Sequence, residues 1–130
     1  MAAGAEAVVD ASVILAFLRA EQVGGHAADV AVGAWISPVN LAEVLTQLRE
    51  LGLSQAEAEA AVAPFQLRVA VFDETSARQV AALRPETRRA GLSLGDRACL
   101  AAAQRLSLPA VTVDRSWAAL DVGVQIRVLR

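Results

Sequence analysis

Four acidic residues in this chain have types and positions that suit metal chemistry: Asp10, Glu43, Asp96 and Asp114. Asp10 and Asp114 each directly follow a short apolar run, whereas Glu43 and Asp96 lie in the first turns of expected helices. Carboxylates that converge repel one another, and some of them take up protons unless a cation neutralises them. Because all four offer only oxygen ligands, the cation that suits them is Mg²⁺, or Mn²⁺ in its place, rather than zinc.

Each of these carboxylates also has a structural explanation. A serine lies three positions before Asp96, which fits a capping box, where the two side chains satisfy backbone N–H groups at a helix start. Asp10 and Asp114 can cap the segments that follow them, as we expect for Asp73, which serves as a comparison residue without a functional role. Glu43 lies on a polar helix face, for which exposure to solvent is the default interpretation.

The composition excludes several other kinds of chemistry. All twelve basic residues are arginine, so the chain has no lysine for a phosphate-binding loop or a Schiff base. The single histidine, His26, excludes a multi-histidine zinc site, and we expect it at the surface. The single cysteine, Cys99, is expected in the core and cannot form an internal disulfide. With no apolar run long enough to span a membrane and no signal-peptide pattern, these features predict a cytoplasmic protein.

The elements that must position the acids are predicted by the alternation of short apolar runs and amphipathic segments. This pattern predicts one α/β domain over residues 1–130, with a central, mainly parallel β-sheet flanked by helices on both faces. The expected strands cover residues 7–10, 35–37, 68–72, 109–114 and 124–129. The expected helices cover residues 13–18, 26–32, 38–51, 54–64, 73–89 and 93–106. Because functional groups gather beyond the carboxyl ends of parallel strands, we expect the four acids to face one cleft.

Four short segments in chain order carry a family resemblance: VVDAS (8–12), NLAEV (40–44), LGDRA (94–98) and VTVDR (111–115). Each segment alone is a weak signal, but the four in this order span nearly the whole chain. Together they resemble the PIN domain, and closely resemble its small single-domain members, the VapC-type ribonuclease toxins of prokaryotic toxin–antitoxin pairs. The resemblance implies a PIN-like fold and metal-dependent endoribonuclease activity, with Mg²⁺ or Mn²⁺ as cofactor.

The resemblance also assigns roles to the four acids as catalytic residues and metal ligands. We expect Asp10 and Asp96 to bind the ion directly and Glu43 to bind through water or to deprotonate the attacking water. Asp114 is expected to hold a second, weaker ion or an outer water. The accessory polar positions of the family are matched by Ser12, Asn40 and Thr112. The resemblance further implies a cognate VapB-like antitoxin and a homodimer.

The net charge of −2 is unfavourable for an RNA-binding protein, so RNA would have to be held locally. Arg97 and Arg115 directly follow two of the acids and are the expected RNA contacts, because the planar guanidinium matches phosphate and stacks on bases. A second basic group, for which salt bridges or a solvated face is the preferred interpretation, consists of Arg84, Arg88 and Arg89.

Two other functions remain as alternatives. The first is a catalytically inert PIN-like module that binds RNA or a protein, which the presence of all four acids disfavours. The second is a receiver-like phosphoacceptor domain, whose usual lysine is missing here.

Overall fold

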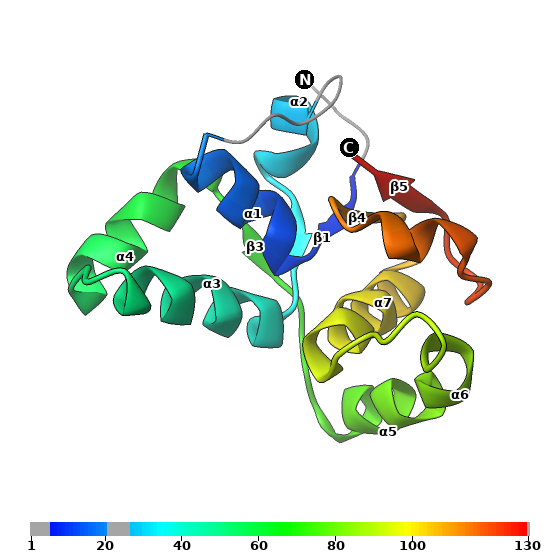
Figure 1. Cartoon of the computed structure of the whole chain (residues 1–130). Coiled ribbons are helices and arrows are strands. Elements are labelled where there is room, and N and C mark those ends of the chain that lie inside the picture. Colours follow the sequence, from blue (N-terminus) through cyan, green and yellow to red (C-terminus); the bar gives the residue numbers. More distant parts are fainter. Residues whose placement is uncertain (1–5, 21–26, 130) are drawn as a thin grey trace.

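The protein is described here by a computed structural model, which covers residues 6–20 and 27–129. Its centre is a five-stranded sheet with helices packed on both faces (Figure 1). The strand order is β3-β2-β1-β4-β5, and every pairing is parallel. The strands are β1 Val8–Val9, β2 Trp35–Ile36, β3 Arg68–Val69, β4 Ala110–Thr112 and β5 Ile126–Val128. The predicted parallel α/β architecture is therefore confirmed.

Most helices begin where the sequence predicts a cap. The α-helices are α1 Ala11–Leu18, α2 Ala27–Ala31, α3 Pro38–Glu50, α4 Gln55–Val62, α5 Glu74–Ala82, α6 Arg84–Thr87 and α7 Leu94–Leu106. Two short 3₁₀ helices, η1 Ala63–Phe65 and η2 Arg115–Ala119, follow α4 and β4. The side chains that cap α1, α3, α4, α5, α7 and η2 belong to Asp10, Ser37, Ser54, Asp73, Ser93 and Asp114.

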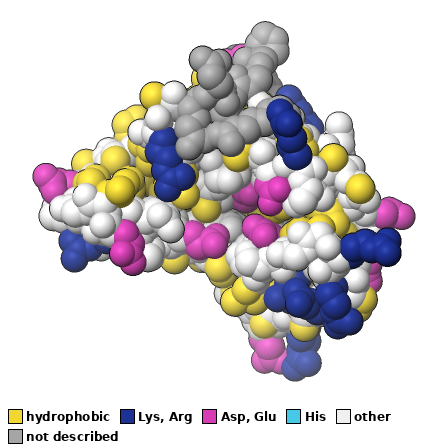
Figure 2. Space-filling model, in the orientation of Figure 1, with side chains coloured by type: hydrophobic (Ala, Val, Ile, Leu, Met, Phe, Trp, Pro, Cys, Tyr) yellow, Lys and Arg dark blue, Asp and Glu magenta, His cyan; other side chains and the backbone are white. Residues whose placement is uncertain are grey.

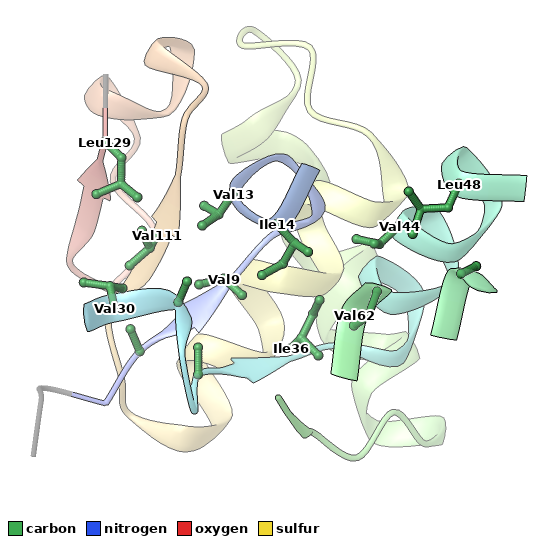
Figure 3. Packing of buried hydrophobic residues seen from close by; sticks show 14 residues of the cluster. Val9, Val13, Ile14, Val30, Ile36, Val44, Leu48, Val62, Val111 and Leu129 are labelled. Atoms are coloured by element: carbon green, nitrogen blue, oxygen red, sulfur yellow. The ribbon is translucent and has the colours of Figure 1, made fainter. Parts of the chain in front are cut away.

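The core consists of two layers, one on each face of the sheet. Successive residues of a strand point to opposite faces, so Val9 packs with α1, α3 and α4, whereas Val8 packs against α7. Figure 3 shows the first layer, in which Ile14 of α1 and Val44 of α3 close over the sheet. The second layer contains Cys99, which is fully buried, as predicted.

Two predicted elements differ clearly from the structure. The strand expected over 68–72 ends at Val69, at the edge of the sheet, where the side chain is 48% exposed. The helix expected over 73–89 is broken into α5 and α6, because Pro85 cannot continue a helix that begins upstream of it. Of the two tryptophans, Trp35 in β2 is only partly buried, with the Arg68 guanidinium 4.8 Å from the centre of its ring, whereas Trp117 in η2 is fully buried.

The expectations for His26 and for the first five residues lie outside the described residues. Over the part of the chain that the structure describes, none of the helices has both the length and the apolar character that a membrane crossing requires.

Candidate active site

A pocket lined by the predicted acids lies at the carboxyl edge of the sheet, between β1 and β4. From β1 the chain proceeds outward to β2 and β3 and then returns to β4 on the other side of β1. In open parallel sheets this reversal leaves a crevice in which ligands bind. The pocket has a volume of about 260 Å³ and is lined by Asp10, Ala11, Ser12, Leu15, Arg19, Glu43, Asp96, Val113 and Asp114. The structure thus brings all four predicted carboxylates to one place.

Asp10 is the most buried of the four acids, with 3% of its surface exposed. Its Oδ1 accepts hydrogen bonds from the Ser12 hydroxyl at 2.6 Å and from the backbone N–H of Val13 at 3.3 Å. Its Oδ2 accepts from the Thr112 hydroxyl at 2.6 Å. Burial raises the pKa of Asp10 to about 6 despite these hydrogen bonds, and the charge of Asp96 adds to the rise. A cation in the pocket would stabilise the ionised form of this carboxyl.

Ser12 and Thr112, two of the predicted accessory residues, form a small hydroxyl network behind the acids. The Ser12 hydroxyl also accepts from the backbone N–H of Val113 at 3.1 Å. The Thr112 hydroxyl accepts from the backbone N–H of Asp114 at 3.1 Å, and the two hydroxyl oxygens are 3.3 Å apart. This network joins the end of β1 to the end of β4, so it fixes the orientation of Asp10 relative to Asp114.

Asp96 completes the predicted capping box at the start of α7. Its Oδ2 accepts from the backbone N–H of Ser93 at 2.9 Å, while its own N–H donates to the Ser93 hydroxyl at 3.2 Å. The cap occupies one carboxylate oxygen, and the side chain still lines the pocket. Asp114 likewise combines a cap with a place in the pocket lining. Its Oδ1 accepts from the backbone N–H of Ser116 at 2.9 Å and caps η2.

Glu43 is held over the N-terminal turn of α7 by Asn40. The Asn40 amide donates to Glu43 Oε1 at 2.8 Å and to the carbonyl oxygen of Gly95 at 3.0 Å. Although Glu43 lies on a polar and exposed face of α3, it is this face that borders the pocket. Figure 2 shows the acidic side chains gathered near the middle of the face where α1, α3 and α7 meet in Figure 1.

The two predicted RNA contacts, Arg97 and Arg115, do not line this pocket. Successive residues of a helix point in different directions, so Arg97 is directed away from its neighbour Asp96 and donates to the carbonyl oxygen of Val80 in α5 at 3.0 Å. Arg115 is exposed at the start of η2. In the second basic group, Arg84 donates to the carbonyl oxygen of Leu92, which agrees with a structural role.

Arg19 is the pocket residue that the sequence analysis missed. Among the described residues that line the pocket it is the one cation. Ala11, Leu15 and Arg19 follow one another at intervals of four, so they lie on one face of the helical turns after Asp10. That spacing from a strand-end aspartate is the signal that could have identified Arg19.

The donor set of the pocket fits Mg²⁺ or Mn²⁺. The described residues that line it offer four carboxylates and the Ser12 hydroxyl, with neither histidine nor cysteine among them. Nowhere in residues 6–20 and 27–129 do three side chains of His, Cys, Asp or Glu lie close enough together to hold an ion between them. An ion here would therefore bind one or two carboxylates directly and reach the others through water, which is the usual coordination of Mg²⁺.

Cys99 lies behind these acids and does not contribute to the chemistry. Burial raises the pKa of its thiol well above the usual value, and the negative charges of Asp10, Asp96 and Glu43 raise it further. A nucleophilic cysteine needs the opposite environment, because only the thiolate reacts.

Comparison with known proteins gives one family and a set of similar folds. The sequence profile of the PIN domain matches residues 7–123, whereas no curated protein gives a significant match. A toxin–antitoxin complex from Klebsiella pneumoniae contains a chain with a TM-score of 0.67 and 19% identity, over 89% of this chain and 93% of that chain. For VapBC-5 from Mycobacterium tuberculosis the TM-score is 0.65 at 25% identity, over 97% and 98% of the two chains. DNA-bound VapBC from Salmonella typhimurium gives 0.66 at 19% identity, over 94% and 96%.

Proposed function

This chain belongs to the PIN domain family, and from that premise we propose that it is a VapC-type toxin that hydrolyses RNA phosphodiester bonds with the help of Mg²⁺ or Mn²⁺ in the cytoplasm. The observation that carries the proposal is the pocket between β1 and β4. Carboxylates from four separate parts of the chain, 33 or more residues apart except for the last two, line this single pocket. The described residues of its lining include neither a histidine nor a cysteine.

In this mechanism the environment of each acidic residue determines whether it binds the ion, accepts a proton or orients water. Asp10 and Asp96 would hold the ion, because Asp10 is oriented by two hydroxyls and Asp96 is oriented by its cap. When bound, the ion polarises the phosphate and lowers the pKa of a water molecule. Glu43, on the exposed side of the pocket, accepts the proton of the attacking water, and Asp114 orients an outer water or a weaker second ion.

The scissile phosphate brings negative charge to a pocket that is already acidic. Arg19 lies on the pocket wall and is the described cation best placed to contact that phosphate. Its guanidinium matches the geometry of a phosphate group. Arg115 is exposed beyond the pocket and contacts the RNA further along the strand. Arg97 is not part of this proposal, because its guanidinium is bonded to α5.

The partners follow from the same family membership. Structures similar in fold are described as toxin–antitoxin and VapBC complexes. We therefore propose that a VapB-like antitoxin binds this chain and blocks RNA cleavage, and that the chain forms a homodimer.

Incubation of the purified chain with a pool of small RNAs tests this function. We expect discrete products with Mg²⁺ or Mn²⁺, and none with EDTA or with Asp96→Asn, whose amide oxygen can still accept the Ser93 hydrogen bond. The matched control is Glu57→Gln, in the equivalent capping box of α4, which should cleave like the wild type. A folded wild-type chain that neither cleaves RNA nor gains thermal stability from the metal ions would contradict the proposal and favour an inert binding module.

A further inference from the structure

Gly95 differs from the other glycines that the structure describes. Gly33, Gly52, Gly91 and Gly123 have φ angles between +70° and +99°, and a β-carbon at any of them would meet no atom within 4 Å. Those four positions therefore need glycine for its backbone conformation. Gly95 lies instead in the first turn of α7 without a positive φ, so its backbone does not require glycine.

Local helix energetics also disfavour glycine at this position. In the interior of a helix glycine is roughly 1 kcal/mol less favourable than alanine, and part of that difference applies in a first turn. A residue that is unfavourable locally needs an explanation from its contacts. Gly95 is buried, and the explanation lies on the neighbouring helix, α3.

The carboxylate of Glu43 lies where the side chain of residue 95 would otherwise be. A β-carbon on Gly95 would lie 2.5 Å from Glu43 Oε1 and 2.7 Å from both Cδ and Oε2. Contacts this short do not occur between these atoms, so either the carboxylate or α7 must move if residue 95 has a side chain.

Asn40 ties the two residues together. Asn40 is 1% exposed, and its amide nitrogen donates to Glu43 Oε1 one helical turn away and to the carbonyl oxygen of Gly95, which is 55 residues further along the chain. Both neighbours are acceptors, so the amide nitrogen must face them. Asn40, on α3, thus holds the Glu43 carboxylate against Gly95. The contact depends on the Asn40 amide as donor and on the absence of a side chain at Gly95.

We propose that Gly95 is a positioning residue of the active site, which acts by leaving room for the Glu43 carboxylate beside the first turn of α7. This inference rests on the proposed function, since it concerns where the proposed proton acceptor lies. A flexible side-chain terminus moves more easily than a helix, so a β-carbon at residue 95 displaces Glu43 and leaves the fold in place. Glu43 then loses its bond to Asn40 and its position beside Asp96.

The variant Gly95→Ala separates this role from a general packing role. We expect the rate of RNA cleavage to fall about 10- to 100-fold, as for other residues that orient metal-site groups, while Mn²⁺ affinity measured by calorimetry changes less, because Asp10 and Asp96 are the proposed ligands. The melting temperature should stay equal or rise slightly, because alanine is the better helix former. The matched control is Leu94→Ala in the same turn, whose side chain is 57% exposed and which should behave like the wild type.

A rescue tests the contact directly. Glu43→Asp shortens the acidic side chain by one methylene group and makes room for a β-carbon. We expect Gly95→Ala combined with Glu43→Asp to cleave RNA faster than the product of the two single effects predicts. Strictly additive effects, wild-type behaviour of Gly95→Ala, or a large fall in its melting temperature would each overturn the proposal.

A crystal structure of Gly95→Ala provides an outcome that does not depend on activity. The proposal expects a displaced Glu43 carboxylate and an unmoved α7, whereas a moved α7 with Glu43 in place would overturn it. If the wild type neither binds Mn²⁺ nor cleaves RNA, the proposed function fails, and this structure alone still decides whether Gly95 positions Glu43.

Discussion

Asp10 and Asp73 occupy similar local positions, but the pKa of Asp10 is raised and the pKa of Asp73 is lowered. Asp10 directly follows β1 and Asp73 lies four residues after the end of β3, and each caps the next helix by accepting a backbone N–H three residues on, that of Val13 or of Ser76. Each also accepts a hydrogen bond from a nearby serine hydroxyl. Yet burial raises the pKa of Asp10 to about 6, whereas the Arg105 guanidinium holds the pKa of Asp73 well below its usual value.

The difference comes from the burial of Asp10, which raises its pKa, and from the cation that the fold supplies to Asp73, which lowers the pKa there. Asp10 Oδ2 receives the neutral hydroxyl of Thr112, while Asp73 Oδ2 receives the charged guanidinium of Arg105 at 3.1 Å. Asp73 is therefore already neutralised, whereas Asp10 lies buried beside other acids, and none of the described residues places a cation on its oxygens. The same cap is a structural feature at the edge of the sheet and a potential metal ligand at its centre.

The largest expected effect comes from Asp10→Asn, which removes the charge that distinguishes the two sites. RNA cleavage should fall more than about 100-fold, beyond the loss typical of residues that only orient a ligand. The variant should also be more stable in the absence of metal, because the buried charge is unfavourable. Raising the pKa of this carboxyl from 3.8 to about 6 corresponds to on the order of 3 kcal/mol at pH 8.

The sign of this effect depends on pH and can be measured by thermal melting between pH 4 and pH 8. A carboxyl with a higher pKa in the folded state binds more protons when folded. Its contribution to stability is therefore greatest below pH 4 and is lost as the pH rises through about 6. We expect Asp10→Asn to melt above the wild type at pH 8 and to converge with it at pH 4. Equal melting temperatures at pH 8 would contradict the assigned environment.

A smaller effect is expected from Thr112→Val, which removes the neutral partner of Asp10 and keeps the volume of the side chain. Asp10 and the backbone N–H of Asp114 both lose a hydrogen bond. Mn²⁺ affinity should fall about 10- to 100-fold, as measured by calorimetry. The matched variant Ser76→Ala removes a hydroxyl from Asp73 and should leave Mn²⁺ binding unchanged, so an equal loss in both variants would remove the distinction between the two sites.

Arg19→Gln tests whether the cation on the pocket wall interacts with RNA rather than with the carboxylates. We expect the KM for RNA to rise several-fold with little change in kcat. The slope of log affinity against log salt concentration should become shallower by about 0.7, the value for one phosphate contact to a single strand. A fall in kcat without a change in the salt slope would show that Arg19 does not contact phosphate.

The smallest effect is expected from Asp73→Asn. Cleavage and Mn²⁺ binding should be unchanged, because Asp73 lies outside the pocket. Its lowered pKa stabilises the protein above about pH 4, the usual carboxyl range, and this stabilisation is lost as the pH falls below it. Since the ion pair with Arg105 is exposed, the melting temperature at pH 7 should fall by no more than a few degrees. A loss of cleavage comparable with that of Asp10→Asn would break the comparison.

The prediction errors have local and non-local origins. The break in the helix predicted over 73–89 has a local signal, because Pro85 lies at the start of α6, just after the end of α5. The side-chain direction of Arg97 also follows from helix geometry once Asp96 is placed in the pocket. By contrast, the early end of β3 reflects its position at the edge of the sheet, which residue patterns do not reveal.

The sequence by itself determined most of the elements and their caps, because these depend on residues within about four positions of one another, and the alternation of the elements predicted the parallel architecture. It also determined which four acids are candidates for the site. Only the tertiary structure decided their environments, since Thr112 reaches Asp10 across 102 residues and Asn40 reaches Gly95 across 55. A carboxylate's pKa and its usefulness to a metal depend on burial and on such distant partners, and these exist only once the sheet order is formed.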